Sequence, residues 1–220
     1  MPCWYEKICE KGITSTTIEH SPNAMILNGF AGTGKSYTIR MMIAQTLSLP
    51  GNENKKVLVM APTGKAALQA GGVTLHSKYG IYLPILKGKE IKRLSSAKLR
   101  DLQNRLKDVC AIIIDEYSML SLIDLCYIND RLQAAYCNQH SFGGIPIAFV
   151  GDPGQLPPVG GLSLWTRKDS RHNPLTGLPL KGSLLYTSIK TVMKLSIVQR
   201  QTDPQVLDFL LAVRDGKVTE

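Results

Sequence analysis

Short runs of consecutive apolar residues alternate along the chain with longer segments in which apolar residues recur every three or four positions. Continuous apolar runs are typical of strands buried on both faces, and the wider spacing is typical of amphipathic helices. The runs predict strands over residues 24–28, 57–61, 110–115, 146–150 and 191–197. Because strands that alternate with helices pair in parallel, we expect an α/β fold with a parallel sheet flanked by helices.

The ends of the predicted helices carry residues that stop or start a helix. Pro50 and Gly51 end the first helix, and Asp203 is placed to cap the last one. Glycine, proline, serine and basic residues crowd the stretch 160–183, which predicts a long surface loop. The helices are predicted over residues 37–49, 65–70, 96–107, 122–136 and 204–213.

A glycine-rich sequence, GFAGTGKS, lies between the first predicted strand and the first predicted helix and fits the pattern GxxxxGK[ST]. Its glycines let backbone N–H groups curl around a phosphate at a helix N-terminus, where the helix dipole also favours negative charge. We expect Lys35 to reach the β- and γ-phosphates of ATP and Ser36 to offer a hydroxyl to Mg²⁺. The alternative is a chance glycine-rich turn. The predicted ATP-binding residues are Gly29, Phe30, Ala31, Gly32, Thr33, Gly34, Lys35 and Ser36.

Two acidic residues follow the apolar run at 111–114. Successive strand residues point to opposite faces, so the two acids are expected to have different roles. Asp115 is the predicted Mg²⁺ ligand, acting through water, and Glu116 is the predicted general base that polarises the attacking water. Exposed strand-end acids without a catalytic role are the alternative interpretation.

A proline-rich turn, GDPGQLPPV, follows the predicted strand at 146–150. It presents Gln155 beyond the C-terminal edge of the sheet, which is where open parallel sheets bind ligands. Gln155 is therefore a candidate sensor that contacts the γ-phosphate and reports its loss. A plain proline-rich turn is the rival interpretation.

The charge balance favours a polyanionic partner. Lysine and arginine outnumber aspartate and glutamate by 26 to 17, which gives a net charge of +9. The basic stretch 87–107 has one apolar face, so its charges are expected to form a solvated surface and a DNA-binding role there is the weaker interpretation.

Several classes of protein are disfavoured by composition. The five cysteines are scattered without a CxxC pair, which argues against a disulfide framework or a zinc site. No apolar run approaches the roughly 18 residues that a membrane span needs. Residues 1–9 lack the apolar core of a secretory signal, so we expect an intracellular protein.

Six sequence motifs occur in a fixed order along the chain: GFAGTGKS, APTGKAA, TLHS, IIIDEYSML, GDPGQLPPV and KLSIVQRQ. This set resembles the PIF branch of RecD-like superfamily-one DNA helicases, and it is most similar in style to the eukaryotic variant that includes the Helitron transposon group. The resemblance covers residues 23–217. It implies a RecA-like phosphate-loop fold and an ATP-dependent DNA helicase that moves 5′ to 3′ along single-stranded DNA.

By this resemblance, the second and third motifs contact single-stranded DNA. Thr63 and Lys65 offer a hydroxyl and a charge to a backbone phosphate, and His76 offers a ring or a hydrogen bond. Without the resemblance, Lys65 is better explained as a solvated helix charge and His76 as a hydrogen-bonded histidine without a ligand. The implied DNA-binding residues are Pro62, Thr63, Gly64, Lys65, Thr74, His76 and Ser77.

The resemblance also implies a catalytic role for Arg200, which would reach the γ-phosphate across the nucleotide cleft; a surface arginine is the alternative. It divides the chain into an N-terminal extension at 1–22, a first RecA-like ATPase domain at 23–198 and the start of a truncated second RecA-like domain at 199–220. The adenine-recognition motif of the family is not found before the phosphate loop.

Three functional interpretations stay open. The leading one is a monomeric helicase motor, expected in the nucleus rather than the mitochondrion and acting in replication, DNA repair, recombination or telomere maintenance. The second is a truncated, nucleotide-dependent DNA-binding module without unwinding activity. The third is a phosphate-loop kinase, which the Gln155 turn and Arg200 disfavour. Because stepping needs two domains that close and open, we expect these residues alone to hydrolyse ATP slowly and not to unwind duplex DNA.

Overall fold

The computed structural model describes residues 23–75, 91, 93–169, 171–199, 201, 203–214 and 217, so the predicted N-terminal extension lies outside the described residues. Six strands form one sheet in the order β3-β2-β4-β5-β1-β6, and every pairing is parallel. The predicted parallel α/β fold is therefore confirmed. The strands are β1 (Ala24–Gly29), β2 (Lys56–Ala61), β3 (Val73–Thr74), β4 (Val109–Ile114), β5 (Ile147–Gly151) and β6 (Thr191–Leu195).

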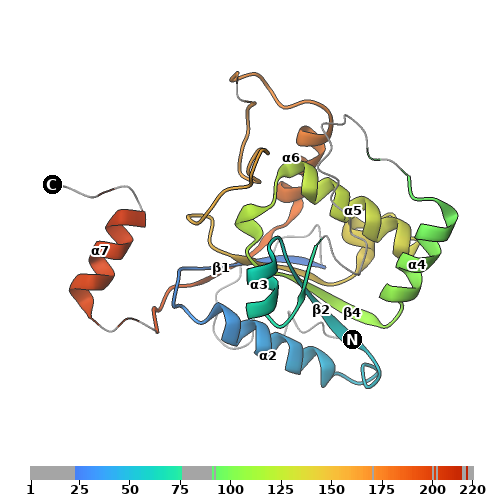
Figure 1. Ribbon diagram of the computed structural model, residues 1–220, viewed down its shortest axis with the longest axis horizontal. Helices are drawn as coiled ribbons and strands as arrows, with labels where there is room; N and C mark the ends of the chain where they lie inside the picture. Colours follow the sequence, from blue (N-terminus) through green and yellow to red (C-terminus); the bar gives the residue numbers. More distant parts are fainter. Residues whose placement is uncertain are drawn as a thin grey trace.

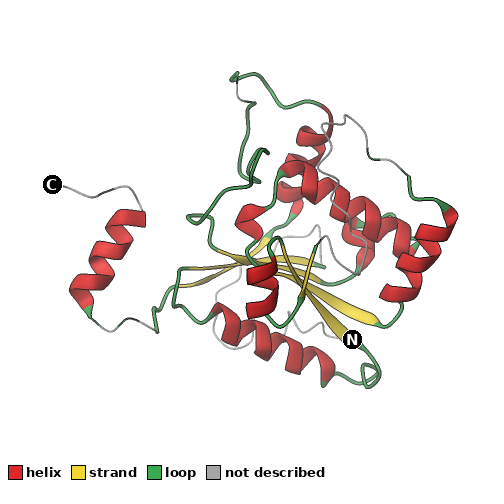
Figure 2. Ribbon diagram, in the orientation of Figure 1, coloured by secondary structure: helices red, strands yellow, loops and turns green. Residues whose placement is uncertain are grey.

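Helices cover both faces of the sheet, with α2 on one face and α4, α5 and α6 on the other (Figures 1 and 2). Helix α7 stands apart from these layers (Figure 1). The helices are α2 (Lys35–Leu47), α3 (Gly64–Gln69), α4 (Ser96–Leu106), α5 (Leu122–Tyr136), α6 (Gly177–Ser188) and α7 (Pro204–Arg214), and two short 3₁₀ turns are η1 (Tyr117–Met119) and η2 (Ser141–Gly144). None of the described helices is long and apolar enough to cross a bilayer.

Two hydrophobic cores lie on opposite faces of the sheet. On the smaller side, Ile39 and Met42 of α2 pack with alternate residues of the central strands, among them Met25 and Leu27. On the larger side, α4, α5 and α6 cover the other set of strand residues. The central strands are thus buried on both faces, which explains their continuous apolar runs.

The predicted surface loop over 160–183 is wrong in its last part, because α6 begins at Gly177. Glycine and proline suggested a loop there. Pro179 is the third residue of the helix, where a missing N–H breaks no intrahelical hydrogen bond. Gly182 is required for packing, since a Cβ at this position would lie 2.1 Å from the carbonyl oxygen of Leu122 in α5.

Two smaller differences concern strand β3 and the start of helix α2. Strand β3 was not predicted, because its two residues are too few to produce an alternating pattern. Helix α2 begins at Lys35, two residues earlier than predicted, since Gly34 in the left-handed conformation (φ 90°) ends the phosphate loop directly before it. The predicted cap of α7 is confirmed, because Asp203 Oδ1 accepts from the Gln205 N–H at 2.9 Å.

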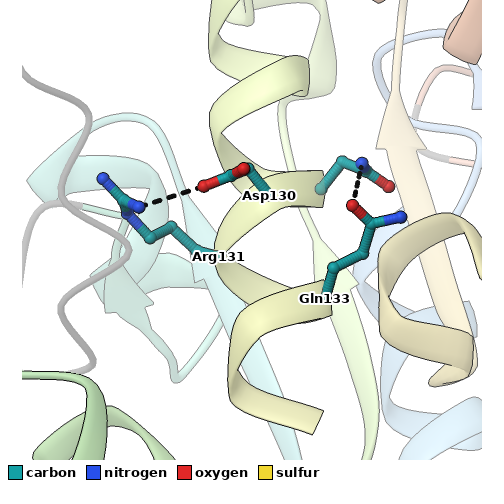
Figure 3. A network of polar contacts seen from close by, with 4 residues as sticks. Asp130, Arg131 and Gln133 are labelled. Carbon is teal, nitrogen blue, oxygen red and sulfur yellow. Dashed lines mark hydrogen bonds and ion pairs between the residues drawn. The ribbon is translucent and has the colours of Figure 1, made fainter. Parts of the chain in front are cut away.

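Polar residues of α5 hold the chain that follows this helix. Figure 3 shows the Arg131 guanidinium directed toward the Asp130 carboxylate, and these groups are 3.0 Å apart. The Gln133 side-chain oxygen accepts from the Asn129 amide at 3.0 Å. Asn129 Oδ1 also accepts from the Phe142 N–H at 2.8 Å, and Gln133 donates to the carbonyl of Gln139 at 2.7 Å. These bonds fix η2 against α5, and β5 starts three residues after η2 ends.

We predict that Gly182→Ala destabilises the fold. The added methyl would overlap the α5 backbone, so α6 must shift away from α5, and we expect the free energy of unfolding to fall by about 3 kcal/mol. Urea denaturation of both proteins measures this difference.

Gly64→Ala is the matched control, because a Cβ at Gly64 meets no atom within 4 Å and the residue is already helical. Its unfolding free energy should stay equal or rise slightly. Equal stability of Gly182→Ala and the parent chain would contradict the close α5–α6 crossing.

Candidate functional site

The ends of three neighbouring strands bring the predicted site residues together. Strands β4, β5 and β1 are adjacent in the sheet and run in the same direction. The turns that follow them, at 115–116, 152–155 and 30–34, therefore meet at the C-terminal edge of the sheet. This edge is where open parallel sheets bind ligands.

The phosphate loop is shaped by its glycines and by internal hydrogen bonds. Gly32 and Gly34 have φ of 80° and 90°, which side-chain-bearing residues rarely adopt. A Cβ at Gly29 would lie 2.5 Å from Thr33 Oγ1. The Lys35 ammonium donates to the carbonyl oxygens of Gly29 at 2.9 Å and Phe30 at 3.2 Å. The lysine thus lies over the loop, where a phosphate group would offer it stronger acceptors.

The acidic pair at the end of β4 lies close to that ammonium. Asp115 is buried, and its Oδ1 accepts from the Glu116 N–H at 2.9 Å. Burial raises the pKa of Asp115, while the Glu116 N–H and the Lys35 charge oppose the rise. Burial also raises the pKa of Glu116, as do the charges of Asp115 and Asp152, and Lys35 again opposes it. The predicted grouping of Lys35 with both acids is thus present in the structure.

Glu116 has a strained backbone. Its φ of 53° and ψ of 43° are in the left-handed region, which is uncommon for residues other than glycine and asparagine. Glu116 lies directly after Asp115, between the end of β4 at Ile114 and the start of η1 at Tyr117. Such strain is concentrated at functional sites, where the surrounding contacts maintain it.

The turn after β5 places Gln155 between two hollows. The Gln155 N–H donates to the Asp152 carbonyl at 3.0 Å, and the Gly154 N–H donates to Asp152 Oδ1 at 3.0 Å, which gives a tight turn. Gln155 lines a phosphate-loop cavity of about 440 Å³ together with residues 30–32, Asp152 and, from α7, Leu207 and Leu210. Gln155 also lines a second hollow, the α3 pocket, of about 170 Å³.

The α3 pocket is lined by some of the predicted DNA-binding residues. Thr63 and Lys65 line it together with Glu116 and Ser118. Thr63 also caps α3, because its hydroxyl accepts from the Ala66 N–H at 3.2 Å.

The other predicted residues are placed as follows. Pro62 precedes Thr63 in the bend after β2, Gly64 is the first residue of α3, and Thr74 pairs with Ala61 in the sheet. Ser36 is exposed in the first turn of α2. His76, Ser77 and Arg200 lie outside the described residues.

Asp152 received no role from the sequence, yet it belongs to the site. It is buried, it lines the phosphate-loop cavity, and its charge helps to raise the pKa of Glu116. A signal was present, since Asp152 comes shortly after the apolar strand predicted at 146–150, as Asp115 comes after the apolar run at 111–114. Its neighbours in the proline-rich turn drew attention to Gln155 instead.

The donors at this edge fit a magnesium ion that is held mainly by phosphate oxygens. In the part of the chain that the structure describes, no group of three or more His, Cys, Asp or Glu residues could hold a metal ion. Mg²⁺ is commonly bound by one or two protein oxygens together with waters and substrate phosphates. The Ser36 hydroxyl and the Asp115 carboxylate are donors of that kind.

Comparison with known proteins identifies the family of this chain. The chain matches a family described as PIF1-like helicase over residues 5–220. It is 32% identical over 220 residues to the ATP-dependent DNA helicase Pif1 of Bdellovibrio bacteriovorus, covering all of this chain and 46% of that protein. It is 35% identical over 195 residues to the ATP-dependent DNA helicase RRM3 of Saccharomyces cerevisiae, covering 87% of this chain and 25% of the relative.

A solved structure of Pif1 helicase from Bacteroides, in complex with ADP-AlF3 and single-stranded DNA, superposes with a TM-score of 0.62 at 28% identity. The superposition covers 90% of this chain and 43% of the other. The chain thus spans less than half the length of these relatives. Since the family match extends over nearly the whole sequence, the chain belongs to the PIF1-like helicase family.

Proposed function

We propose that this chain forms the ATP-hydrolysing part of a DNA helicase that couples hydrolysis to movement along single-stranded DNA. The observation that carries the proposal is the place of Gln155, which lines both the phosphate-loop cavity and the α3 pocket. A nucleotide at the loop and a DNA strand at α3 would therefore share one side chain. The relative from Bacteroides was solved with a nucleotide analogue and single-stranded DNA together, which supports this pairing of ligands.

Each residue at the strand ends has a proposed part in hydrolysis. The Lys35 ammonium leaves the Gly29 and Phe30 carbonyls and binds the β- and γ-phosphates. Ser36 and, through water, Asp115 would hold Mg²⁺, and the bound ion would supply positive charge to the transferred phosphoryl group. Glu116 accepts a proton from the attacking water. Arg200 supplies a further positive charge to the γ-phosphate.

Glu116 is suited to act as a base because its carboxylate is poorly solvated. Burial and the neighbouring Asp115 and Asp152 charges raise its pKa, and a higher pKa makes the ionised carboxylate a stronger proton acceptor. The opposing effect of Lys35 would weaken when the ammonium binds phosphate. Nucleotide binding would then increase the basicity of Glu116 further.

Coupling to DNA is proposed to run through the turn at 152–155. When the γ-phosphate leaves, Gln155 loses a contact at the phosphate-loop cavity and can move within the α3 pocket, next to Thr63 and Lys65. A shift of these residues would change their contacts with a backbone phosphate of the DNA. Hydrolysis would thereby alternate the DNA affinity of this domain.

Several finer statements remain predictions from the resemblance. They are 5′ to 3′ movement, a monomeric motor, a nuclear location, roles in DNA repair, recombination and telomere maintenance, and the likeness to the Helitron-type variant. The division into residues 1–22, a RecA-like domain at 23–198 and the start of a second one at 199–220 also belongs to the proposal. Unwinding in this proposal requires a second RecA-like domain that closes on the first, as the resemblance implies.

We predict that single-stranded DNA stimulates ATP hydrolysis by the chain and that Lys35→Ala lowers the rate by at least about a hundredfold, because the phosphates lose their only charge contact from the loop. Release of inorganic phosphate, with and without an oligonucleotide, measures both effects.

Lys190→Ala is the matched control, since Lys190 is exposed and directly precedes β6. It therefore lies at the N-terminal edge of the parallel sheet, and the site lies at the C-terminal edge. This variant should hydrolyse ATP as the parent does. Hydrolysis that no single strand stimulates would contradict the coupling, and equal rates for Lys35→Ala and the parent would contradict the nucleotide site.

We predict that Lys65→Ala weakens binding of a fluorescent single-stranded oligonucleotide about fivefold, because one phosphate contact is lost. The slope of log affinity against log salt should decrease by about 0.7, the value for one phosphate contact on a single strand. Fluorescence anisotropy at several salt concentrations measures both quantities. An unchanged slope, with Lys190→Ala behaving identically, would show that Lys65 does not contact DNA.

We predict that Glu116→Asn raises the melting temperature while hydrolysis falls by about two orders of magnitude or more. Asparagine tolerates the left-handed backbone and removes a poorly solvated charge near Asp115 and Asp152, so a gain of about 1 kcal/mol is expected.

Glu116→Gln separates the two causes, because it removes the charge but keeps the backbone strain. Its melting temperature should lie between those of the parent and Glu116→Asn in a thermal melt at neutral pH. If both variants melt at or below the parent temperature, the left-handed backbone and the poorly solvated charge of Glu116 do not destabilise the fold.

A further inference from the structure

A hydrogen bond joins the acidic end of β4 to the phosphate-loop end of β1. The Tyr117 hydroxyl donates to Asn28 Oδ1 at 2.6 Å, although the two residues are 89 positions apart. Tyr117 directly follows the Asp115–Glu116 pair, and Asn28 directly precedes Gly29 of the phosphate loop. The bond therefore connects the two halves of the hydrolytic site.

The tyrosine reaches Asn28 by passing over the strand between them. Strand β5 lies between β4 and β1, and Gly151 at its end is paired with Asn28. A Cβ at Gly151 would lie 2.9 Å from Tyr117 Cδ1 and 3.1 Å from the Tyr117 nitrogen. Only a glycine leaves room for the ring, so three neighbouring strand ends together provide this contact.

The surroundings keep Tyr117 fixed and neutral. Its side chain is fully buried, and the ring packs within the larger hydrophobic core. Burial, and after it the neighbouring Tyr186 of α6, raises the pKa of Tyr117, so its hydroxyl remains a hydrogen-bond donor over the whole physiological pH range. A fully buried ring with a hydrogen-bonded tip has little freedom to move.

We propose that Tyr117 is a positioning residue for nucleotide hydrolysis, setting the distance between the phosphate loop and the acidic pair through its bond to Asn28. This inference rests on the proposed function and adds to it a residue that the mechanism does not otherwise use. Tyr117 also follows Glu116, whose left-handed backbone must be maintained by neighbouring contacts. An anchored Tyr117 fixes one side of that residue, so the carboxylate keeps its direction toward the attacking water.

The test compares Tyr117→Phe with the parent chain by steady-state ATP hydrolysis. The ring remains and only the hydroxyl is lost, so nucleotide binding by the loop should be retained, with KM within about twofold. The value of kcat should fall about fivefold to tenfold, because the reacting groups are held less well in the attack geometry. Binding of ADP with aluminium fluoride, a mimic of the transferred phosphoryl group, should weaken by a similar factor, while ADP binding is unchanged.

A double variant separates positioning from stability. Tyr117→Phe alone leaves Asn28 Oδ1 without this donor and should lower the melting temperature by a few degrees. Tyr117→Phe combined with Asn28→Leu replaces the donor and the acceptor of this bond by apolar groups, which can restore the part of the stability that depends on it; the interaction of Tyr117 with Tyr186 is lost in both variants. We expect the melting temperature to recover in the double variant and kcat to stay low. A kcat that recovers together with the melting temperature would overturn the proposal.

Tyr136→Phe is the matched control for loss of a tyrosine hydroxyl. That hydroxyl donates to the carbonyl of Leu106 at 3.3 Å, far from the site and near the opposite end of β4. Its kcat should equal that of the parent. If Tyr117→Phe also retains the parent kcat and the parent affinity for ADP with aluminium fluoride, Tyr117 has no positioning role, while the proposed function stands. A parent chain that binds no nucleotide overturns both.

Discussion

Two poorly solvated carboxyl groups after β4 lie near the ammonium of Lys35, and the rest of the site depends on this grouping. Burial raises the pKa of both Asp115 and Glu116, and the Lys35 charge acts against that rise. Lys35 is in turn held by the Gly29 and Phe30 carbonyls. The order of the strands makes this arrangement possible, because β5 alone separates the two strand ends and is itself terminated by a glycine.

Much of the fold could be predicted because its elements have strong local patterns. Strands buried on both faces are continuous apolar runs, and α5 was predicted with the bounds that it has, Leu122–Tyr136. Helix α6 could not be predicted in the same way, since Gly182 is there for contact with Leu122 in α5 and not for a turn. A sequence does not distinguish a glycine that permits close helix packing from a glycine that forms a loop. Only the position of the neighbouring helix distinguishes them.

The candidate site could be predicted where one short segment carries a complete chemical pattern. The phosphate loop and the acidic pair each have their residues within eight positions, so spacing alone predicted Lys35, Asp115 and Glu116. Asp152 follows a predicted strand, but its part in the site, like that of Tyr117, depends on contacts between different strand ends. Their significance comes from tertiary distances, such as the 2.6 Å between Tyr117 and an asparagine 89 residues earlier.

The site combines rigid and strained parts in one short stretch of chain. Asp115 and Tyr117 are buried and hydrogen-bonded, and Glu116 between them has the left-handed backbone. Because both neighbours are fixed, the strained residue cannot relax without breaking one of these bonds. The surroundings of Gln155 are different, since this residue belongs to an irregular turn that borders two hollows. In the proposed mechanism, the residues at the rigid end of β4 perform hydrolysis, and the turn that contains Gln155 couples hydrolysis to DNA binding. A turn can change position at low cost while the groups that perform hydrolysis stay aligned.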